Sequence, residues 1–215
     1  MNKEIDELLL KADLGINNAL RHPEVAGLMS LLGYTPEKLT AGKVILTNAQ
    51  NLQAKQVKEA GEEDGASDEL RLKRSEAHHT YMNYVKIARI AFKNDAGMWT
   101  KLQLNGRRKQ SYSGWISQAR LFYTNLMADE PAMAKISEFG VTAEKLQAGM
   151  DLVLAVEDQL ARLKQESGEA QDATKARDKA VDVLQDWYSD FRAIARIALQ
   201  GRPQFLEMLG IIEPS

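Results

Sequence analysis

The stretch Ile87-Ala88-Arg89-Ile90-Ala91 (IARIA) occurs twice, the second time unchanged at residues 194–198. The two occurrences lie 107 positions apart (194 − 87). The same shift, without a gap, aligns a second run of identical residues: Gly33, Thr35, Glu37, Lys38 and Leu39 with Gly140, Thr142, Glu144, Lys145 and Leu146. Repetition at this distance predicts a tandem duplication of one structural unit rather than a short-period solenoid. We therefore expect two similar helical units, residues 1–106 and 107–215.

The sequence predicts an all-α protein. It contains five prolines, and its apolar residues recur every three or four positions, which is the spacing of one helix face. In each unit we expect a long helix, a short helix, and then two helices that form an antiparallel hairpin. The first hairpin turn is predicted at residues 61–67 (GEEDGAS), because two glycines interrupt a polar run there.

These elements predict a helical bundle of two tandem copies of a unit of about 105 residues. A pseudo-twofold axis would relate the copies, and we expect them to pack as one compact body because no Pro/Gly/Ser-rich linker separates them. Two separate three-helix bundles are the other arrangement. Gly33 is expected to end a helix in the left-handed conformation, and Thr35 to cap the next helix at its N-terminus.

Retained charged residues suggest a structural role. In the predicted hairpins, Glu37 and Arg89 fall at similar heights on neighbouring helices, as do Glu144 and Arg196. Buried charges are normally paired. We therefore predict the structural ion pairs Glu37–Arg89 and Glu144–Arg196, and treat a ligand-binding role for these residues as the less favoured alternative. The retained Gly42 would allow the paired backbones to approach closely.

The composition excludes several classes of protein. There is no cysteine, which rules out disulfides, thiolate catalysis and cysteine-ligated zinc, and fits a reducing cytoplasm. The N-terminus is acidic where a secretory signal would be basic, and no apolar run approaches the length of a membrane span. The net charge is −2. We expect a cytoplasmic protein that does not enter the membrane.

One stretch, residues 96–128, contains no acidic residue. Its basic and aromatic members form a candidate patch for an anionic partner: Lys101, Arg107, Arg108, Lys109, Trp115 and Arg120. Interleaved basic and aromatic side chains are typical of sites for phosphates and bases. The favoured interpretation is that the aromatic residues belong to the core and that the basic residues lie in solvent. We do not expect nucleic-acid binding, because five positive charges make a small basic field.

Motifs for catalysis are scarce. Glu76 and His79 form a Glu-x-x-His pair, as in di-iron bundles, but the residues 107 positions later are Val183 and Asp186. There is no phosphate-binding glycine loop and no nucleophile elbow. We therefore expect neither a cofactor nor a metal.

Aromatic residues gather late in each copy, among them Tyr81, Trp187 and Tyr188. They could line an apolar pocket, although contact between the copies is the favoured interpretation.

The function that follows is a non-enzymatic interaction or scaffold protein. Its partner would be another protein, or a second copy of the chain in a homodimer. A small-ligand or nucleic-acid binder that uses residues 96–128 is the alternative, and a metal-dependent carboxylate enzyme is the second alternative.

Overall fold

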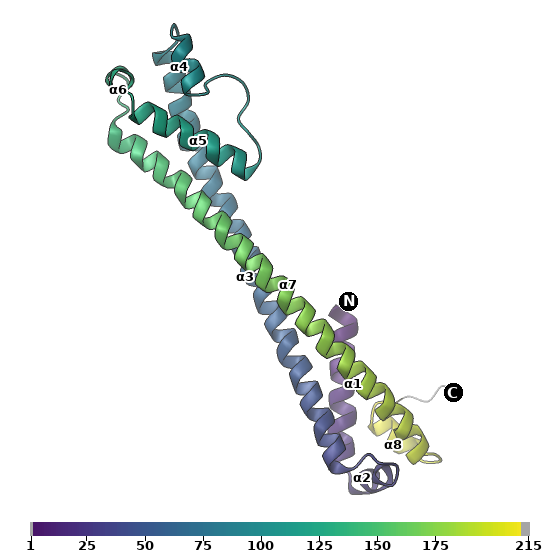
Figure 1. Ribbon diagram of the computed structural model, residues 1–215. Helices are drawn as coiled ribbons and strands as arrows, with labels where there is room; N and C mark the ends of the chain where they lie inside the picture. The colour runs from purple at the N-terminus through teal and green to yellow at the C-terminus, as the bar shows by residue number, and fades with distance from the viewer. Residues whose placement is uncertain (1, 212–215) are drawn as a thin grey trace. The chain divides into compact units, whose positions relative to one another are not determined.

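The chain is built of α-helices, as the sequence predicts. The computed structural model describes residues 2–211, and every regular element in that range is an α-helix (Figure 1). In chain order the helices are α1 (Asn2–Arg21), α2 (Pro23–Ser30), α3 (Pro36–Ala91), α4 (Ala96–Lys101), α5 (Tyr112–Met127), α6 (Glu130–Ser137), α7 (Ala143–Ala198) and α8 (Pro203–Met208). Among these helices, none has both the length and the apolar character needed to cross a membrane.

The helix boundaries follow the 107-residue shift. Adding 107 to the first and last residues of α2, α3 and α4 gives those of α6, α7 and α8. For any residue, we call the residue 107 positions before or after it its counterpart. Local signals set these ends. Gly33 and Gly140 have φ angles of +82° and +73°, and Thr35 and Thr142 each accept a 3.4 Å hydrogen bond from a backbone N–H of the next helix. The predicted glycine and Thr35 roles are confirmed.

The predicted hairpin turn at residues 61–67 is wrong, because α3 is one helix of 56 residues. The buried residues Ala66, Leu70 and Ala77 continue the three- and four-residue spacing of the core face through this region. No proline interrupts it, and Gly61 and Gly65 are exposed helical residues. A glycine inside a helix destabilises the helix by about 1 kcal/mol relative to alanine. Continuous burial of the core face contributes more stability than this. The counterpart helix α7 is likewise continuous over 56 residues.

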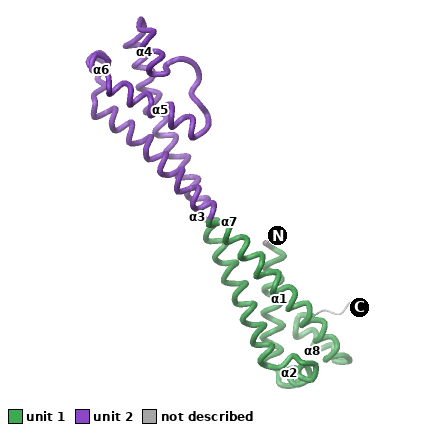
Figure 2. The backbone as a smooth tube through the Cα atoms, viewed as in Figure 1, with its two compact units in different colours: residues 1–60, 169–215 green, residues 61–168 purple. Residues whose placement is uncertain are grey.

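The chain forms two compact units, each with its own core (Figure 2). Unit 1 comprises residues 1–60 and 169–215, and unit 2 comprises residues 61–168. Neither is one of the predicted halves 1–106 and 107–215. Each unit combines one part of α3 with one part of α7, and the boundaries lie inside these two helices. In place of the predicted hairpin between consecutive helices, each unit therefore pairs a segment of α3 with a segment of α7 that lies far away in the sequence.

Unit 1 contains α1, α2, the first part of α3, the last part of α7, and α8. Its core includes Leu39 and Leu46 from α3 and Leu184 and Phe191 from α7. Gly42 lies under the Trp187 ring, which a Cβ atom at this position would overlap. The retained glycine thus accommodates an aromatic ring rather than a close approach of two backbones.

Unit 2 contains the last part of α3, then α4, α5 and α6, and the first part of α7. Its core is rich in aromatic residues, with Tyr81 in contact with Trp115, Phe122 and Tyr123 at ring-centroid distances of 5.4–6.2 Å. Gly149, the counterpart of Gly42, lies against the Tyr123 ring. Tyr81 belongs to residues 1–106 and the three rings it contacts belong to residues 107–215, so aromatic residues of the two halves of the sequence pack against each other inside one unit, as the favoured interpretation predicts.

Candidate functional site

The predicted ion pairs are not formed. Glu37 lies in the first turn of α3 and Arg89 in its last turn, so 52 residues of helix separate them (89 − 37). Glu144 and Arg196 occupy the corresponding ends of α7. Arg89 instead donates from Nε and Nη2 to the carbonyl oxygen of Leu104, at 3.0 and 2.6 Å. The prediction failed because it depended on the hairpin turn, which does not exist.

Glu37 and Glu144 act locally at the helix starts. Hydrogen bonds from the hydroxyl groups of Thr35 and Thr142 lower the pKa of the two carboxyl groups, and backbone N–H groups act in the same direction. A carboxylate in the first helical turn also interacts favourably with the helix dipole. The two carboxylates therefore have the same capping role at the starts of α3 and α7.

The basic stretch 96–128 does not form one exposed patch. Lys101 pairs with Asp129 at 2.6 Å, and Arg120 pairs with Glu157 at 2.8 Å. Both acids lie outside the stretch in the sequence, so the local absence of acidic residues does not mean that these charges are unpaired. Arg107 and Lys109 are exposed.

Arg108 is a core residue, 8% exposed. Its Nη1 donates to the Tyr81 hydroxyl at 2.9 Å, and its Nη2 donates to the carbonyl oxygens of Asn105 and Gly106 at 2.8 and 3.3 Å. A guanidinium with three such acceptors is held as part of the fold. It closes the loop between α4 and α5 over Tyr81.

Trp115 is fully buried. Its indole Nε1 donates to His78 Nδ1 at 3.1 Å, and the guanidinium of Arg74 lies 3.7 Å from the centre of its ring. Burial, with help from Arg74 and Arg108, lowers the pKa of His78. The imidazole is therefore neutral near pH 7 and able to accept this hydrogen bond.

Glu76 and His79 are exposed. Within residues 2–211, neither belongs to a cluster of three side chains close enough to share a metal ion. The Glu-x-x-His spacing alone therefore assembles no metal site.

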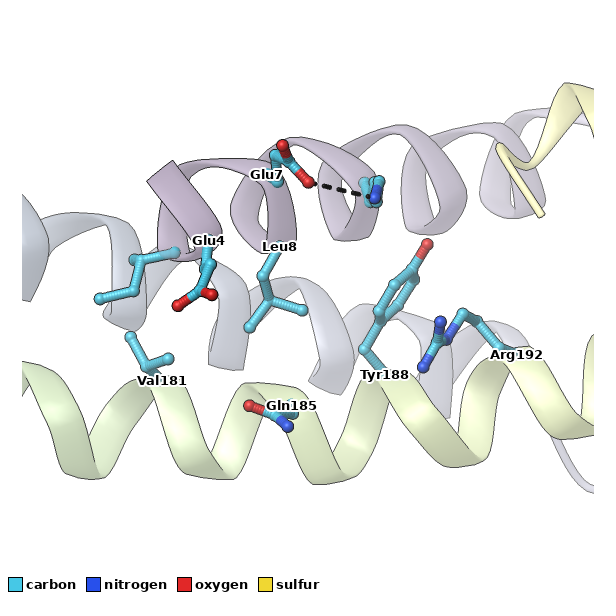
Figure 3. A pocket seen from close by; sticks show the side chains of 9 residues that line it. Glu4, Glu7, Leu8, Val181, Gln185, Tyr188 and Arg192 are labelled. Atoms are coloured by element: carbon cyan, nitrogen blue, oxygen red, sulfur yellow. Dashed lines mark hydrogen bonds and ion pairs between the residues drawn. The ribbon is translucent and has the colours of Figure 1, made fainter. Parts of the chain in front are cut away.

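A cavity of about 340 Å³ with both apolar and polar walls lies in unit 1 between α1 and the last part of α7 (Figure 3). Its apolar wall includes Ile5, Leu8 and Val181. Its polar residues are Glu4, Glu7, Lys11, Gln185, Tyr188 and Arg192. Figure 3 shows Arg192 beside Tyr188 at one end of the cavity and Glu4 beside Val181 at the other.

Two buried polar atoms at the Arg192 end have no hydrogen-bond partner among residues 2–211. They are the Tyr188 hydroxyl and Arg192 Nε. The Arg192 guanidinium carbon lies 5.2 Å from the centre of the Tyr188 ring. Burial raises the pKa of Tyr188, against the opposing influence of Arg192 and Arg196. The phenol therefore keeps its proton at neutral pH and can donate it in a hydrogen bond.

Unit 1 also has an apolar groove of about 460 Å³ between α3 and α7. Its lining residues are Val44, Ile45, Asn48, Leu52, Ala176, Lys179, Ala180 and Val183. Val44 is 65% exposed and Val183 is 48% exposed, so two aliphatic side chains border the groove in contact with solvent.

Sequence reasoning found neither feature, since each combines residues more than 120 positions apart on α1 or α3 and on α7. One signal was present. At the groove, the 107-residue shift pairs Val44 with Asp151 and Val183 with Glu76, and aliphatic residues where the other copy is charged indicate a difference in use. Comparison with protein-family models, curated proteins and solved structures finds no match for the chain.

Proposed function

We propose that the protein is a non-enzymatic interaction protein that binds an amphipathic helix of a partner protein in the α3–α7 groove of unit 1. The observation that carries this proposal is the apolar groove with Val44 and Val183 exposed at its edges. Exposed apolar grooves on helical proteins are typical docking sites for helices.

The same helix pair already binds one helix on its core side. Ile5, Leu9 and Ala12 of α1 share the hydrophobic core of unit 1 with α3 and α7. A second amphipathic helix could pack into the groove by the same side-chain spacing, with apolar residues at positions i, i+3 or i+4, and i+7.

The positive charge in the groove indicates which side chains the partner helix should carry. Lys179 lines the groove and is exposed, and within residues 2–211 no ion pair to it is formed. An acidic residue beside the apolar stripe of the partner helix would complement it. The counterpart positions in unit 2 include Asp151, Glu69 and Glu76, so that unit offers a charged surface instead.

We further propose that the chain arose by tandem duplication and that only one of its two units kept an apolar groove. The matching helix boundaries and the identical residues 107 positions apart support this history. A cytoplasmic location is part of the proposal, supported by the lack of cysteine.

The test is photo-crosslinking in cells of the source organism. A benzoylphenylalanine side chain replaces Val183 in the groove and, as the matched control, Glu76 at the counterpart position in unit 2. We expect an adduct with one protein from position 183 and none from position 76. Mass spectrometry should map the adduct to a helix with an apolar stripe and an adjacent acid, and Val44→Glu should abolish it.

Equal adducts from both positions, or none from position 183, would overturn the proposal. An adduct at twice the mass of the chain would replace the partner helix with a second copy of this protein.

A further inference from the structure

We propose that the cavity between α1 and α7 in unit 1 binds a small aliphatic carboxylate, with its carboxylate oxygens at Tyr188 and Arg192 and its hydrocarbon body along Leu8. This site is separate from the groove of the proposed partner helix, because the two share no lining residue.

The unpartnered atoms carry a free-energy cost. Tyr188 is 2% exposed, and among residues 2–211 neither its hydroxyl nor Arg192 Nε has a hydrogen-bond partner. A buried polar group without a hydrogen bond costs about 1–3 kcal/mol. A ligand that accepts from both groups recovers this free energy on binding.

In unit 2 the hydroxyl at the counterpart of Tyr188 has a partner, whereas the counterpart of Arg192 is Val85. Tyr81, the counterpart of Tyr188, accepts a hydrogen bond from Arg108. Trp115, the counterpart of Leu8, is fully buried beside Tyr81. The larger ring takes up volume that the smaller Leu8 leaves open in unit 1.

The chain topology explains why the units differ. Arg108 reaches Tyr81 from the segment between α4 and α5, which connects the two copies of the repeat. In unit 1 the corresponding helices, α8 and α1, are not consecutive in the chain, so within residues 2–211 no segment from α8 to α1 reaches Tyr188 as Arg108 reaches Tyr81.

The chemistry of the two donors identifies the ligand class. Arg192 Nε can only donate, and the Tyr188 hydroxyl is protonated, so each can donate to one oxygen of a carboxylate. Lys11 is paired with Glu7 at 3.5 Å, whereas within the described range no carboxylate pairs with Arg192. An ammonium group at this end would meet the positive charge of Arg192.

The neighbouring wall sets the shape of the ligand. Ile5 and Val181 are 7% and 8% exposed and, with Leu8, form the apolar wall of the cavity. Leu8 lies between the Tyr188 end and Val181 (Figure 3). A short alkyl chain would gain about 0.8 kcal/mol for each methylene it buries there. A volume of about 340 Å³ suits a small molecule.

The test is isothermal titration of the full chain at pH 7 with sodium hexanoate, sodium acetate, hexylamine and inorganic phosphate. Hexanoate should bind at least about tenfold more tightly than acetate, since it adds buried methylenes, and hexylamine should not bind. Amide chemical-shift changes with hexanoate should fall at residues 4–11 and 181–192.

Three variants locate the carboxylate. Tyr188→Phe and Arg192→Gln should each weaken hexanoate binding about tenfold or more. Leu8→Trp, which introduces the unit 2 residue, should abolish it. The matched control is Tyr81→Phe in unit 2, which loses the bond to Arg108 but should leave hexanoate affinity unchanged.

The proposal is overturned if hexylamine or phosphate binds as tightly as hexanoate, or if no probe binds. It is also overturned if Tyr188→Phe keeps full affinity, a result that stands even should Leu8→Trp fail to fold. If no partner adduct forms at position 183 while hexanoate still binds, the proposed function is refuted and the ligand site is not.

Discussion

At the scale of single residues, two arginines hold the segment that follows α4 in place. Arg89 and Arg108 both donate to backbone carbonyls of the segment that follows α4. Guanidinium groups suit this task because they remain charged and donate in several directions at once. The neighbouring Arg107 is exposed, so adjacent arginines in the sequence have different roles.

We predict that Arg108→Met lowers the free energy of unfolding by about 2 kcal/mol, because the Tyr81 hydroxyl and two carbonyls lose a charged donor. Arg107→Met is the control and should change it by less than about 0.5 kcal/mol. Urea denaturation followed by circular dichroism measures both. Equal effects of the two substitutions would contradict the buried role of Arg108.

The lowered pKa of His78 predicts that the free energy of unfolding depends on pH. Burial and the guanidinium groups of Arg74 and Arg108 lower its pKa below the ordinary value of 6.5. The unfolded chain therefore takes up the proton more readily than the folded one. The stabilisation is complete above about pH 6.5 and is lost as the pH falls through the lower folded pKa, where protonated Nδ1 can no longer accept from Trp115.

The measurement is urea denaturation at pH 7 and pH 5. We expect His78→Gln to lose less stability between these pH values than the wild type, because the amide oxygen of glutamine accepts the indole N–H and does not titrate. Identical losses for the two proteins would show that His78 makes no such contribution.

At the scale of elements, the two 56-residue helices are the main departure from expectation. Their glycines fall into two groups. A Cβ atom at Gly61, Gly65 or Gly168 would meet no heavy atom within 4 Å, whereas one at Gly42 or Gly149 would overlap an aromatic ring. The first group only weakens the helix, and the second group makes room for core packing.

Alanine at Gly61, Gly65 or Gly168 should therefore raise the free energy of unfolding by about 0.5–1 kcal/mol each. Alanine at Gly42 or Gly149 should lower it by about 1–3 kcal/mol, because Trp187 or Tyr123 must move. Chemical denaturation of the five variants provides the comparison. Destabilisation by Gly61→Ala and Gly65→Ala would favour the turn that the sequence suggested over a continuous helix.

At the scale of the whole molecule, the compact units cut across the sequence repeat. The core residues of unit 2 all come from residues 61–168, which are contiguous. Those of unit 1 come from two distant segments. A fragment that keeps one complete core should fold, and a fragment with half of each core should not.

We predict that residues 61–168 alone unfold in a cooperative thermal transition, measured by circular dichroism at 222 nm. Residues 1–106, a fragment of similar length, should show no cooperative transition as a monomer. Adding residues 107–215 to this fragment should restore one, because each unit draws on both halves. Cooperative folding of monomeric 1–106 would support the repeat halves as the folding units.

Much of the local structure could be read from the sequence, whereas the candidate sites could not. The ends of α2 and α3 follow from His22-Pro23, Gly33 and Thr35, whose effects act within one helical turn. The residues 61–67 were misjudged because polar residues with glycine are compatible with both a turn and an exposed helix. Burial of Ala66 and Leu70 decides between these, and burial depends on distant residues.

The sequence by itself determined the helical class, the ends of α2, the start of α3 and the 107-residue correspondence, because these depend on backbone preferences and on spacing along the chain. Only the tertiary structure decided which helix segments pack together, which arginines are buried, and that Tyr188 lacks the partner that Tyr81 has. Hydrophobic burial has no direction along the chain, so the same apolar stripe can pack against a neighbouring segment or a distant one.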